Sequence, residues 1–323
     1  MLEVILDNRN GTLWDISGIC SEISWKTSRT GKPSSVDLTF ISDGLYQDKA
    51  FTVNTGDVLR IRKDGQGLFW GYVFEVESGR DEQVSLKAYD QLRYLNESDT
   101  YVRINVTADQ VIRDNCAVGD LKLGTLAPTG YVIPKVLEDG QKRLDIIYRA
   151  LDNTMIATGR LYVLYDDYGS LMLRDVEDMT IDLILGDGSL VYDYRIKRSI
   201  DSDTYNRIKL VQDNKESGKR DVYITQDSST IARWGRLQYY QKVDDKLNPA
   251  QVQAIMDGLI QLKNRETQQF KLDALGFVGM RAGVKVQVTI SKQKINSYFL
   301  VDECTHQFSG EDHTMKLTLR VYG

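Results

Sequence analysis

The sequence contains few of the residues with which proteins usually build catalytic or metal sites. Its 323 residues include only two histidines, His306 and His313, and three cysteines, Cys20, Cys116 and Cys304. The cysteines are odd in number and far apart, which is typical of reduced thiols and unlike a disulfide framework. No stretch approaches the roughly 20 consecutive apolar residues of a membrane span, and the N-terminus lacks the pattern of a secretory signal. We therefore expect a protein synthesised in the cytoplasm, with no membrane anchor.

Positive charge is also scarce. Lysine and arginine together number 41 against 46 aspartates and glutamates, so the formal net charge is −5. A protein dedicated to nucleic acid usually has a basic excess or a basic stripe, and this chain has no such excess. Apolar residues make up 41% and charged residues 27% of the chain, which is ordinary for a folded protein. The length then allows two or three domains with hydrophobic cores of their own.

Catalytic and cofactor-binding motifs are absent from the sequence. It has no HExxH, no paired CxxC, no GxSxG, no Walker loop and no GxGxxG. Cys304 and His306 alternate onto one face of a predicted strand just after Asp302, but a zinc site needs three or four converging ligands. A packed histidine is the favoured interpretation, and Asp201 and Asp203 are interpreted as turn residues rather than Ca²⁺ ligands. We expect no catalytic residue, no cofactor and no metal, and hence a protein that is not an enzyme.

Residues 1–98 have the pattern of an antiparallel β-domain. Short runs rich in β-branched and aromatic residues are separated by turn residues, and apolar and polar residues alternate within the runs. The predicted strands are residues 4–6, 16–25, 35–41, 58–62, 68–75 and 84–89. Many short strands at this spacing indicate a small barrel or sandwich.

Residues 99–190 have a mixed pattern. Thr107 and Gln110 have the spacing of a capping box and predict a helix that begins there. Residues 119–140 are predicted to be loop with one short strand, and residues 160–165 and 170–174 to form a hairpin. A second helix with one apolar face is predicted from the spacing of Leu144, Ile147, Tyr148 and Leu151. This region is expected to be a small α/β domain.

Residues 191–323 are again rich in β-patterned runs. One helix is predicted near residues 249–264, with Asn248 as its N-cap and Pro249 as its first residue. A polar turn is predicted at residues 213–219. The predicted strands are residues 208–211, 222–225, 268–275, 284–290, 298–304 and 315–321.

A weak internal repeat links the two β-rich regions. Residues 56–88 and residues 283–319 both run in the order glycine, strand, loop, strand, polar turn, strand. Two related β-domains in one chain are the simplest account of this match. The predicted fold is therefore α+β and predominantly β, with antiparallel β-barrel domains at residues 1–98 and 191–323 that flank a small α/β domain at residues 99–190.

Several runs of residues together resemble a known family; they are residues 139–169, 199–210, 213–220, 234–240, 281–283 and 306–315. Over essentially its whole length the chain is similar to the XkdQ/YqbQ family of PBSX-like prophages. That family is related to the late-control-D type hub of contractile tails and to the central hub of the T-even phage baseplate. Ordinary core and turn positions are the alternative interpretation of the motif residues. Those that we single out as structurally important are Tyr205, Asn206, Arg207, Trp234, Gly235, Gly283 and His306.

The resemblance implies a structural protein of a contractile injection tail. Hubs of this kind are homotrimers in which each chain contributes two tail-tube-like β-barrels, so three chains make a ring of pseudo-sixfold symmetry. Such a ring joins the six-fold tail tube, or its initiator, to the three-fold central spike, beside the baseplate wedge proteins. DNA would pass through its lumen without specific binding. The implied location is the baseplate of a virion or tail-like particle, whether phage, defective prophage or R-type bacteriocin.

Two other functions stay open on the sequence. The four tryptophans and 18 tyrosines could line a glycan platform, although cross-strand core pairs are the usual role of such residues in β-proteins. The chain would then be a peptidoglycan-binding or cell-wall-hydrolysing tail protein, with the compact insert around residues 100–180 as the glycan-binding module. A spike-type effector of a secretion system is disfavoured because no long β-helical repeat follows the second β-domain. Spike or lytic activity is expected on another polypeptide.

Overall fold

The computed structural model describes residues 1–42, 48–80, 82–214 and 218–322. The chain divides into two compact units, of which the first consists of residues 1–154, 160–195 and 270–323. The second consists of residues 155–159 and 196–269. Strands predominate in the chain, as the sequence predicts. No described helix is long and apolar enough to span a membrane.

The helices and strands have the following bounds. The first unit contains β1 (Leu2–Asp7), β2 (Leu13–Asp15), β3 (Cys20–Ser28), β4 (Ser35–Ile41), β5 (Val58–Lys63), β6 (Gln66–Ser78), β7 (Gln83–Tyr89), η1 (Gln91–Asn96), β8 (Ser98–Thr107), α1 (Ala108–Val118), β9 (Leu123–Leu126), β10 (Val132–Lys142), α2 (Arg143–Thr158, whose last turn belongs to the second unit), β11 (Tyr162–Asp166), β12 (Leu171–Asp175), η2 (Val176–Met179), β13 (Thr180–Gly186), β19 (Lys285–Ile290), η3 (Ser291–Gln293), β20 (Ile295–Ser309) and β21 (Asp312–Val321). Strands β14 (Val191–Ser199) and β18 (Thr267–Leu275) lead into and out of the second unit, which contains β15 (Arg207–Asn214), β16 (Lys219–Gln226), α3 (Ser228–Trp234), β17 (Gln238–Lys242) and α4 (Pro249–Lys263).

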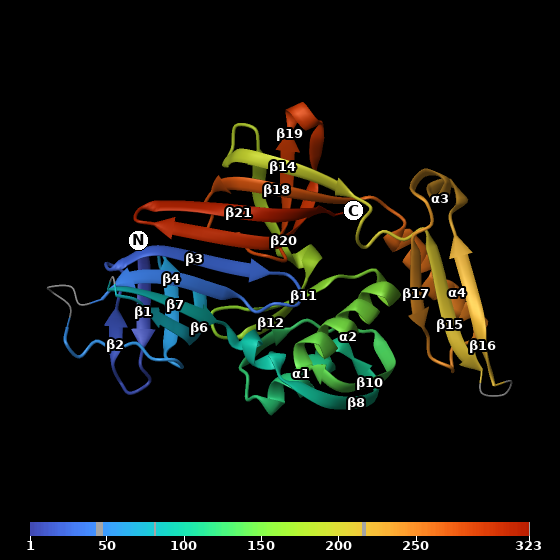
Figure 1. The fold of residues 1–323 in the computed structure, drawn as a ribbon, viewed down its shortest axis with the longest axis horizontal. Coiled ribbons are helices and arrows are strands. Elements are labelled where there is room, and N and C mark those ends of the chain that lie inside the picture. The colour runs from blue at the N-terminus through green and yellow to red at the C-terminus, as the bar shows by residue number, and fades with distance from the viewer. Residues whose placement is uncertain (43–47, 81, 215–217, 323) are drawn as a thin grey trace. The chain divides into compact units, whose positions relative to one another are not determined.

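One sheet of 13 strands extends through the β-rich part of the chain (Figure 1). Its first half has the strand order β3-β4-β7-β6-β5-β1, with β2 beside β1. Its second half has the order β14-β18-β21-β20-β19-β13. Taken in chain order, β1, β3, β4, β5, β6 and β7 occupy the same places as β13, β14, β18, β19, β20 and β21. The first strands differ in direction, because β1 is antiparallel to β5 whereas β13 is parallel to β19. The internal repeat of the sequence is therefore a repeat of the fold.

The repeat extends to individual hydrogen bonds. Gly56 N donates to Val73 O at 2.7 Å, and Gly283 N donates to Val301 O at 2.8 Å. In each half the same valine also donates its own N–H to the carbonyl of the residue after the glycine, at 2.8 and 2.9 Å. The two glycines have φ angles of +92° and +94°, a region that residues with a Cβ rarely adopt. Gly56 and Gly283 are therefore equivalent positions, as are the two valines.

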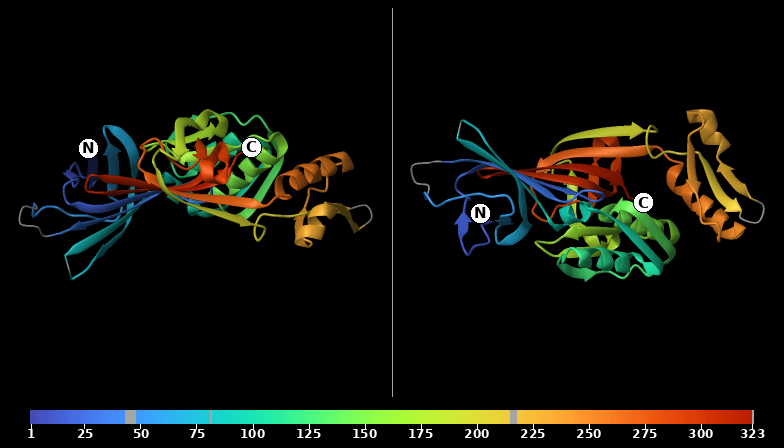
Figure 2. Two further views of the ribbon diagram at one scale, coloured as in Figure 1. Left: turned by 90° about the horizontal axis from the view of Figure 1, so that it is seen from above. Right: turned by 60° about the horizontal axis from the view of Figure 1, so that its bottom comes forward.

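Strand β20 joins the two halves because it changes its partner at a bulge. Along one edge it pairs first with β19, through Ile295–Leu300, and then with β3, through Glu303–Phe308. Asp302 lies at the bulge and accepts hydrogen bonds from Arg29 Nε at 2.8 Å and from Arg320 Nε at 3.0 Å. Strands of both halves consequently lie side by side in one continuous sheet (Figures 1 and 2).

The two expected closed barrels are not found among the described residues. The strands follow one open path instead, in which β3 pairs with β20 of the other half. Each half still encloses a core of its own. Buried side chains of the first core include Val4, Leu38 and Phe40, and those of the second include Phe270, Val286 and Leu317.

Residues 98–175 contain the helices α1 and α2 and the strands of two short sheets. Gln110 Oε1 accepts from Thr107 N at 3.1 Å, which confirms the capping box of α1; α2 and the β11–β12 hairpin are also confirmed. The loop with one short strand predicted for residues 119–140 is wrong, because this stretch contains β9 and most of β10. Pro134 and Gly140 within β10 explain the error, since both residues are unusual inside strands.

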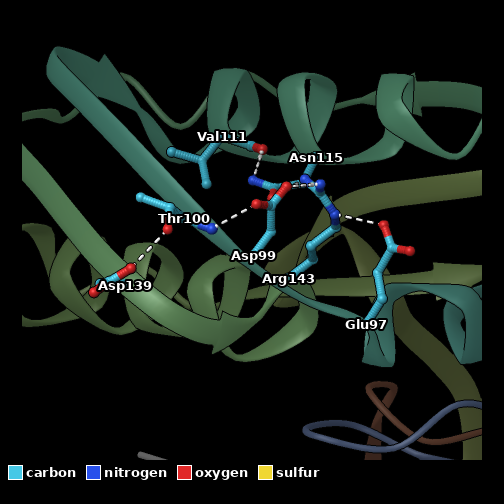
Figure 3. A network of polar contacts seen from close by, with 7 residues as sticks. All are labelled: Glu97, Asp99, Thr100, Val111, Asn115, Asp139 and Arg143. Atoms are coloured by element: carbon cyan, nitrogen blue, oxygen red, sulfur yellow. Dashed lines mark hydrogen bonds and ion pairs between the residues drawn. The ribbon is translucent and has the colours of Figure 1, made fainter.

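Arg143, the first residue of α2, holds this region together (Figure 3). Its side chain is only 7% exposed, although its carboxylate partners are half exposed. Arg143 Nε donates to Glu97 Oε1 at 2.6 Å, and the guanidinium forms an ion pair with Asp99. A third contact, 3.4 Å long, reaches Asn115 Oδ1 on α1. The residue thus links both helices to Glu97, just before β8, and to Asp99 at the start of β8.

The second unit is a three-stranded sheet of order β16-β15-β17, with α4 against β15 and β16. Asn248 Oδ1 accepts from Gln251 N at 2.9 Å, and Pro249 begins α4, which confirms the predicted start of this helix. Helix α3, capped by Asp227, was not expected. Part of the turn predicted at residues 213–219 lies outside the described residues. The buried core is formed by Ile208, Leu210, Val252, Met256 and Leu259.

Candidate functional site

The motif residues fall at two places in the fold. Tyr205, Asn206, Arg207, Trp234 and Gly235 all belong to the second unit, whereas Gly283 and His306 belong to the first. No single site therefore contains all seven.

Asn206 is the centre of the group in the second unit. It is fully buried, and its side-chain amide donates to Gly235 O at 2.8 Å while its Oδ1 accepts from Leu237 N at 2.9 Å. Its backbone N donates to Leu237 O, and its carbonyl accepts from Asp227 N, both at 3.0 Å. One side chain thus satisfies backbone groups of the loop after α3, which is a structural role.

The neighbours of Asn206 have similar roles. The ring centroid of Tyr205 lies 5.3 Å from that of Tyr239, against the core. Arg207 Nε donates to Gln238 Oε1 at 3.1 Å across the sheet. Gly235 ends α3 with a φ of +78°, and its N–H donates to Ile231 O. The group organises the turn after α3 and the start of β15.

Gly283 lies where the second half approaches the α/β region. A Cβ added there would be 2.7 Å from Cγ1 of Val163 on β11. At the equivalent Gly56 a Cβ would meet nothing within 4 Å. Gly283 therefore combines a backbone requirement with a packing requirement.

His306 is fully buried at the junction of β20 and β3, which confirms the interpretation as a packed strand histidine. Its ring stacks on Trp25, its register partner on β3, with centroids 4.9 Å apart. His306 Nε2 lies 2.8 Å from Met280 O and therefore carries the proton. His306 Nδ1 then accepts from His313 Nε2 at 2.9 Å. Two neutral imidazoles thus link β20, β21 and β3.

The contacts of Asp302 and Cys304 differ from those of metal ligands. Cys304 Sγ lies 3.3 Å from His306 Nε2, and burial raises the pKa of the Cys304 thiol, which keeps it protonated. Asp302 is held by two arginines instead of facing this pair. Within the described ranges, no group of three or more His, Cys, Asp or Glu residues is arranged to hold a metal ion.

We expect acid to destabilise the long sheet through His306. Burial lowers the pKa of this histidine from 6.5 to about 4, so the unfolded chain takes up the proton first as the pH falls. The stabilisation that comes from burying the neutral His306 is complete above pH 6.5 and is lost as the pH falls towards 4. A lowering of the pKa from 6.5 to about 4 corresponds to about 3 kcal/mol of the free energy of unfolding. Urea unfolding at pH 7 and pH 4.5 measures the loss.

The control for this prediction is His306→Phe. Phenylalanine keeps an aromatic ring beside Trp25 but cannot bind a proton, so the variant should lose less stability between the two pH values than the wild type. An equal loss in both proteins would contradict the prediction. His313, whose pKa is also lowered to about 4 but which is half exposed, contributes less because solvent screens it.

A buried polar cluster beside Gly283 was missed by sequence reasoning. Asp166 Oδ2 accepts from Gln91 Nε2 at 2.8 Å, and Asp90 Oδ2 accepts from Ser34 N at 2.9 Å. Burial raises the pKa of both carboxyls, and Arg281 lies with its guanidinium carbon 3.9 Å from the centroid of the Tyr165 ring. The sequence places Asp166 only between the two strands of the hairpin predicted at residues 160–165 and 170–174. No local pattern indicates the cluster, because its members come from distant segments.

The long sheet has a groove of about 440 Å³ with both polar and apolar lining, formed by residues of β3, β4, β6, β7 and β20. Its charged lining consists of four carboxylates, on Glu22, Asp37, Glu75 and Glu77, and one ammonium group, on Lys87. Asp37 forms ion pairs with Lys26 at 3.1 Å and with Lys87 at 3.7 Å, so part of this negative charge is compensated within the sheet.

Comparisons with known proteins identify a family, relatives in sequence and proteins of similar fold. The profile of the YQBQ-like family matches residues 23–320. The phage-like element PBSX protein XkdQ of Bacillus subtilis (strain 168) is 30% identical over 305 residues, which cover 93% of this chain and 91% of that protein. The 43 kDa tail protein of prophage MuSo2 from Shewanella oneidensis has a TM-score of 0.71 at 14% identity, with 98% of each chain covered. The tail protein of Neisseria meningitidis MC58 also has a TM-score of 0.71, at 13% identity, with 99% and 96% covered.

Proposed function

This chain belongs to the YQBQ-like family, and from that premise we propose that it is the baseplate hub of a contractile injection tail. The observation that carries the proposal is the pair of sheet halves with the same strand order within one chain. Three such chains present six equivalent halves, which is what an adaptor between a six-fold tube and a three-fold spike requires. The relatives named above are prophage and tail proteins, so the virion or a tail-like particle is the location.

The role is structural rather than catalytic. The hub trimer would contact the tail tube protein or its initiator on one side and the central spike on the other, with wedge proteins around it. DNA would pass through the lumen of this ring without specific binding, which suits a chain with a net charge of −5 and no basic excess.

We expect the purified chain to form a homotrimer. Light scattering should then give three times the chain mass of 36.8 kDa over a range of concentrations. A chain that stays monomeric at the highest soluble concentration would count against the hub. The same preparation should release nothing from purified cell walls in a turbidity assay; clearing of the walls would favour a wall-hydrolysing tail protein instead.

A further inference from the structure

The place where β3 pairs with β20 has an equivalent in the first half of the sheet, on β6, where no second strand is paired among the described residues. After the bulge in β20, the edge of Glu303–Phe308 is covered by β3, and Cys304 and His306 are fully buried. Strand β6, which is equivalent to β20, has a bulge between Val73 and Glu75. On the corresponding edge, β5 pairs with β6 only as far as Tyr72.

The edge of β6 beyond that point has no strand beside it in the described part of the chain. Glu75–Ser78 pair with β7 on the other edge only. Val76 occupies the place that Cys304 has in β20, yet it is 37% exposed where Cys304 is fully buried. Glu75 and Glu77 are also exposed. A free edge with an exposed valine is a ready template for another strand.

The strand that would cover this edge by equivalence is β14. It occupies the place of β3 in the second half, and it is the end strand of the sheet path, beside β18 only. Tyr192 is 59% exposed and Ile196 36% exposed. β14 also carries the exposed basic residues Arg195, Lys197 and Arg198.

The charges of the two free strands are complementary. At the junction inside the chain, Arg29 pairs with Asp302 at 2.8 Å and Lys32 lies 3.5 Å from Glu303, so a basic segment already meets an acidic one. At the free edges the basic residues lie within β14 itself, and the carboxylates of Glu75 and Glu77 lie on β6.

We propose that β14 of one copy pairs antiparallel with Glu75–Ser78 of β6 in a second copy, as β3 pairs with β20 within the chain. The proposal rests on the proposed homotrimer and specifies its interface. The contact is heterologous, since each copy offers one strand and accepts another, and such contacts form closed rings when the rotation allows. Three copies then give a ring of six sheet halves joined by three internal and three intermolecular junctions.

Charge reversal tests the proposal. One variant carries Glu75→Arg and Glu77→Arg, a second carries Arg195→Glu and Lys197→Glu, and a third combines all four changes. Like charges facing each other across an interface cost several kcal/mol. We therefore expect the first two variants to have a trimer about 100-fold weaker and to scatter light as 36.8 kDa monomers, while the third recovers the trimer.

The matched control reverses charge at exposed positions away from both strands, with Lys135→Glu on β10 and Glu311→Arg in the turn after β20. This control should remain trimeric, and circular dichroism should show that all variants are folded. A trimer that survives both reversals, or reversals that the combined variant does not rescue, would overturn the interface and leave the hub function standing. A wild-type chain that is monomeric at every concentration would overturn the trimer and the interface with it.

Discussion

Asn206→Ala is expected to unfold the second unit while the long sheet stays folded. Alanine removes the side-chain partners of Gly235 O and Leu237 N in the loop after α3, which is partly exposed. Each lost hydrogen bond then costs about 1 kcal/mol, and the fully buried site of Asn206 also loses packing. We expect a total loss of about 2–3 kcal/mol, which is a large part of the stability of a unit of this size.

Hydrogen exchange in the full chain measures this effect. Amides of β15 and β17 should lose their protection in Asn206→Ala, whereas those of β20 and β21 should keep theirs. The matched control is Gln253→Ala, which removes an exposed amide of α4 that donates to Asp257 at 2.8 Å and should change stability by less than about 0.5 kcal/mol. Unchanged protection of β15 in Asn206→Ala would contradict the central role of this residue.

Gly283→Ala is expected to destabilise the first unit by about 3 kcal/mol or more, because two costs add. Alanine strains the backbone at a φ of +94°, which costs about 1–3 kcal/mol. Its Cβ also lies 2.7 Å from Val163 Cγ1, a contact that β11 must move to relieve. Urea unfolding monitored by tryptophan fluorescence measures the change.

The internal repeat supplies the matched control, Gly56→Ala. Gly56 has nearly the same φ but open space around it, so alanine there should cost only the backbone strain, about 1–3 kcal/mol. The difference between the two variants isolates the contact with Val163. Equal losses would show that this contact does not limit the position.

Much of the local structure could be predicted because its signals are local. The capping box at Thr107 and Gln110 placed α1, and Asn248 with Pro249 placed α4. Alternation of period two located most strands of both halves, but no strand was predicted at β2, β13 or β14. These signals failed at residues 119–140, where Pro134 and Gly140 conceal β10, and at α3, which is too short to show a helical period.

The site residues were predictable only in part. His306 was interpreted as a packed strand histidine, which its complete burial confirms. The cluster of Asp90, Asp166 and Arg281 was not predicted, because each residue alone has the pattern of an ordinary turn or strand end. Hydrogen-bond partners that lie 75 residues apart, such as Gln91 and Asp166, leave no mark on local periodicity.

The sequence by itself determined that the chain is predominantly β and that two stretches share one order of glycine, strand and turn. Both features could be predicted because strand periodicity and the backbone conformation of glycine depend on residues that are close together in the sequence. Only the tertiary structure decided how the halves meet. Thr27 contacts the carbonyl of Cys304, 277 residues away, and β20 passes from β19 to β3 at the bulge held by Asp302. A strand can pair along either edge with any partner of suitable shape, so the choice is settled by long-range burial and ion pairs.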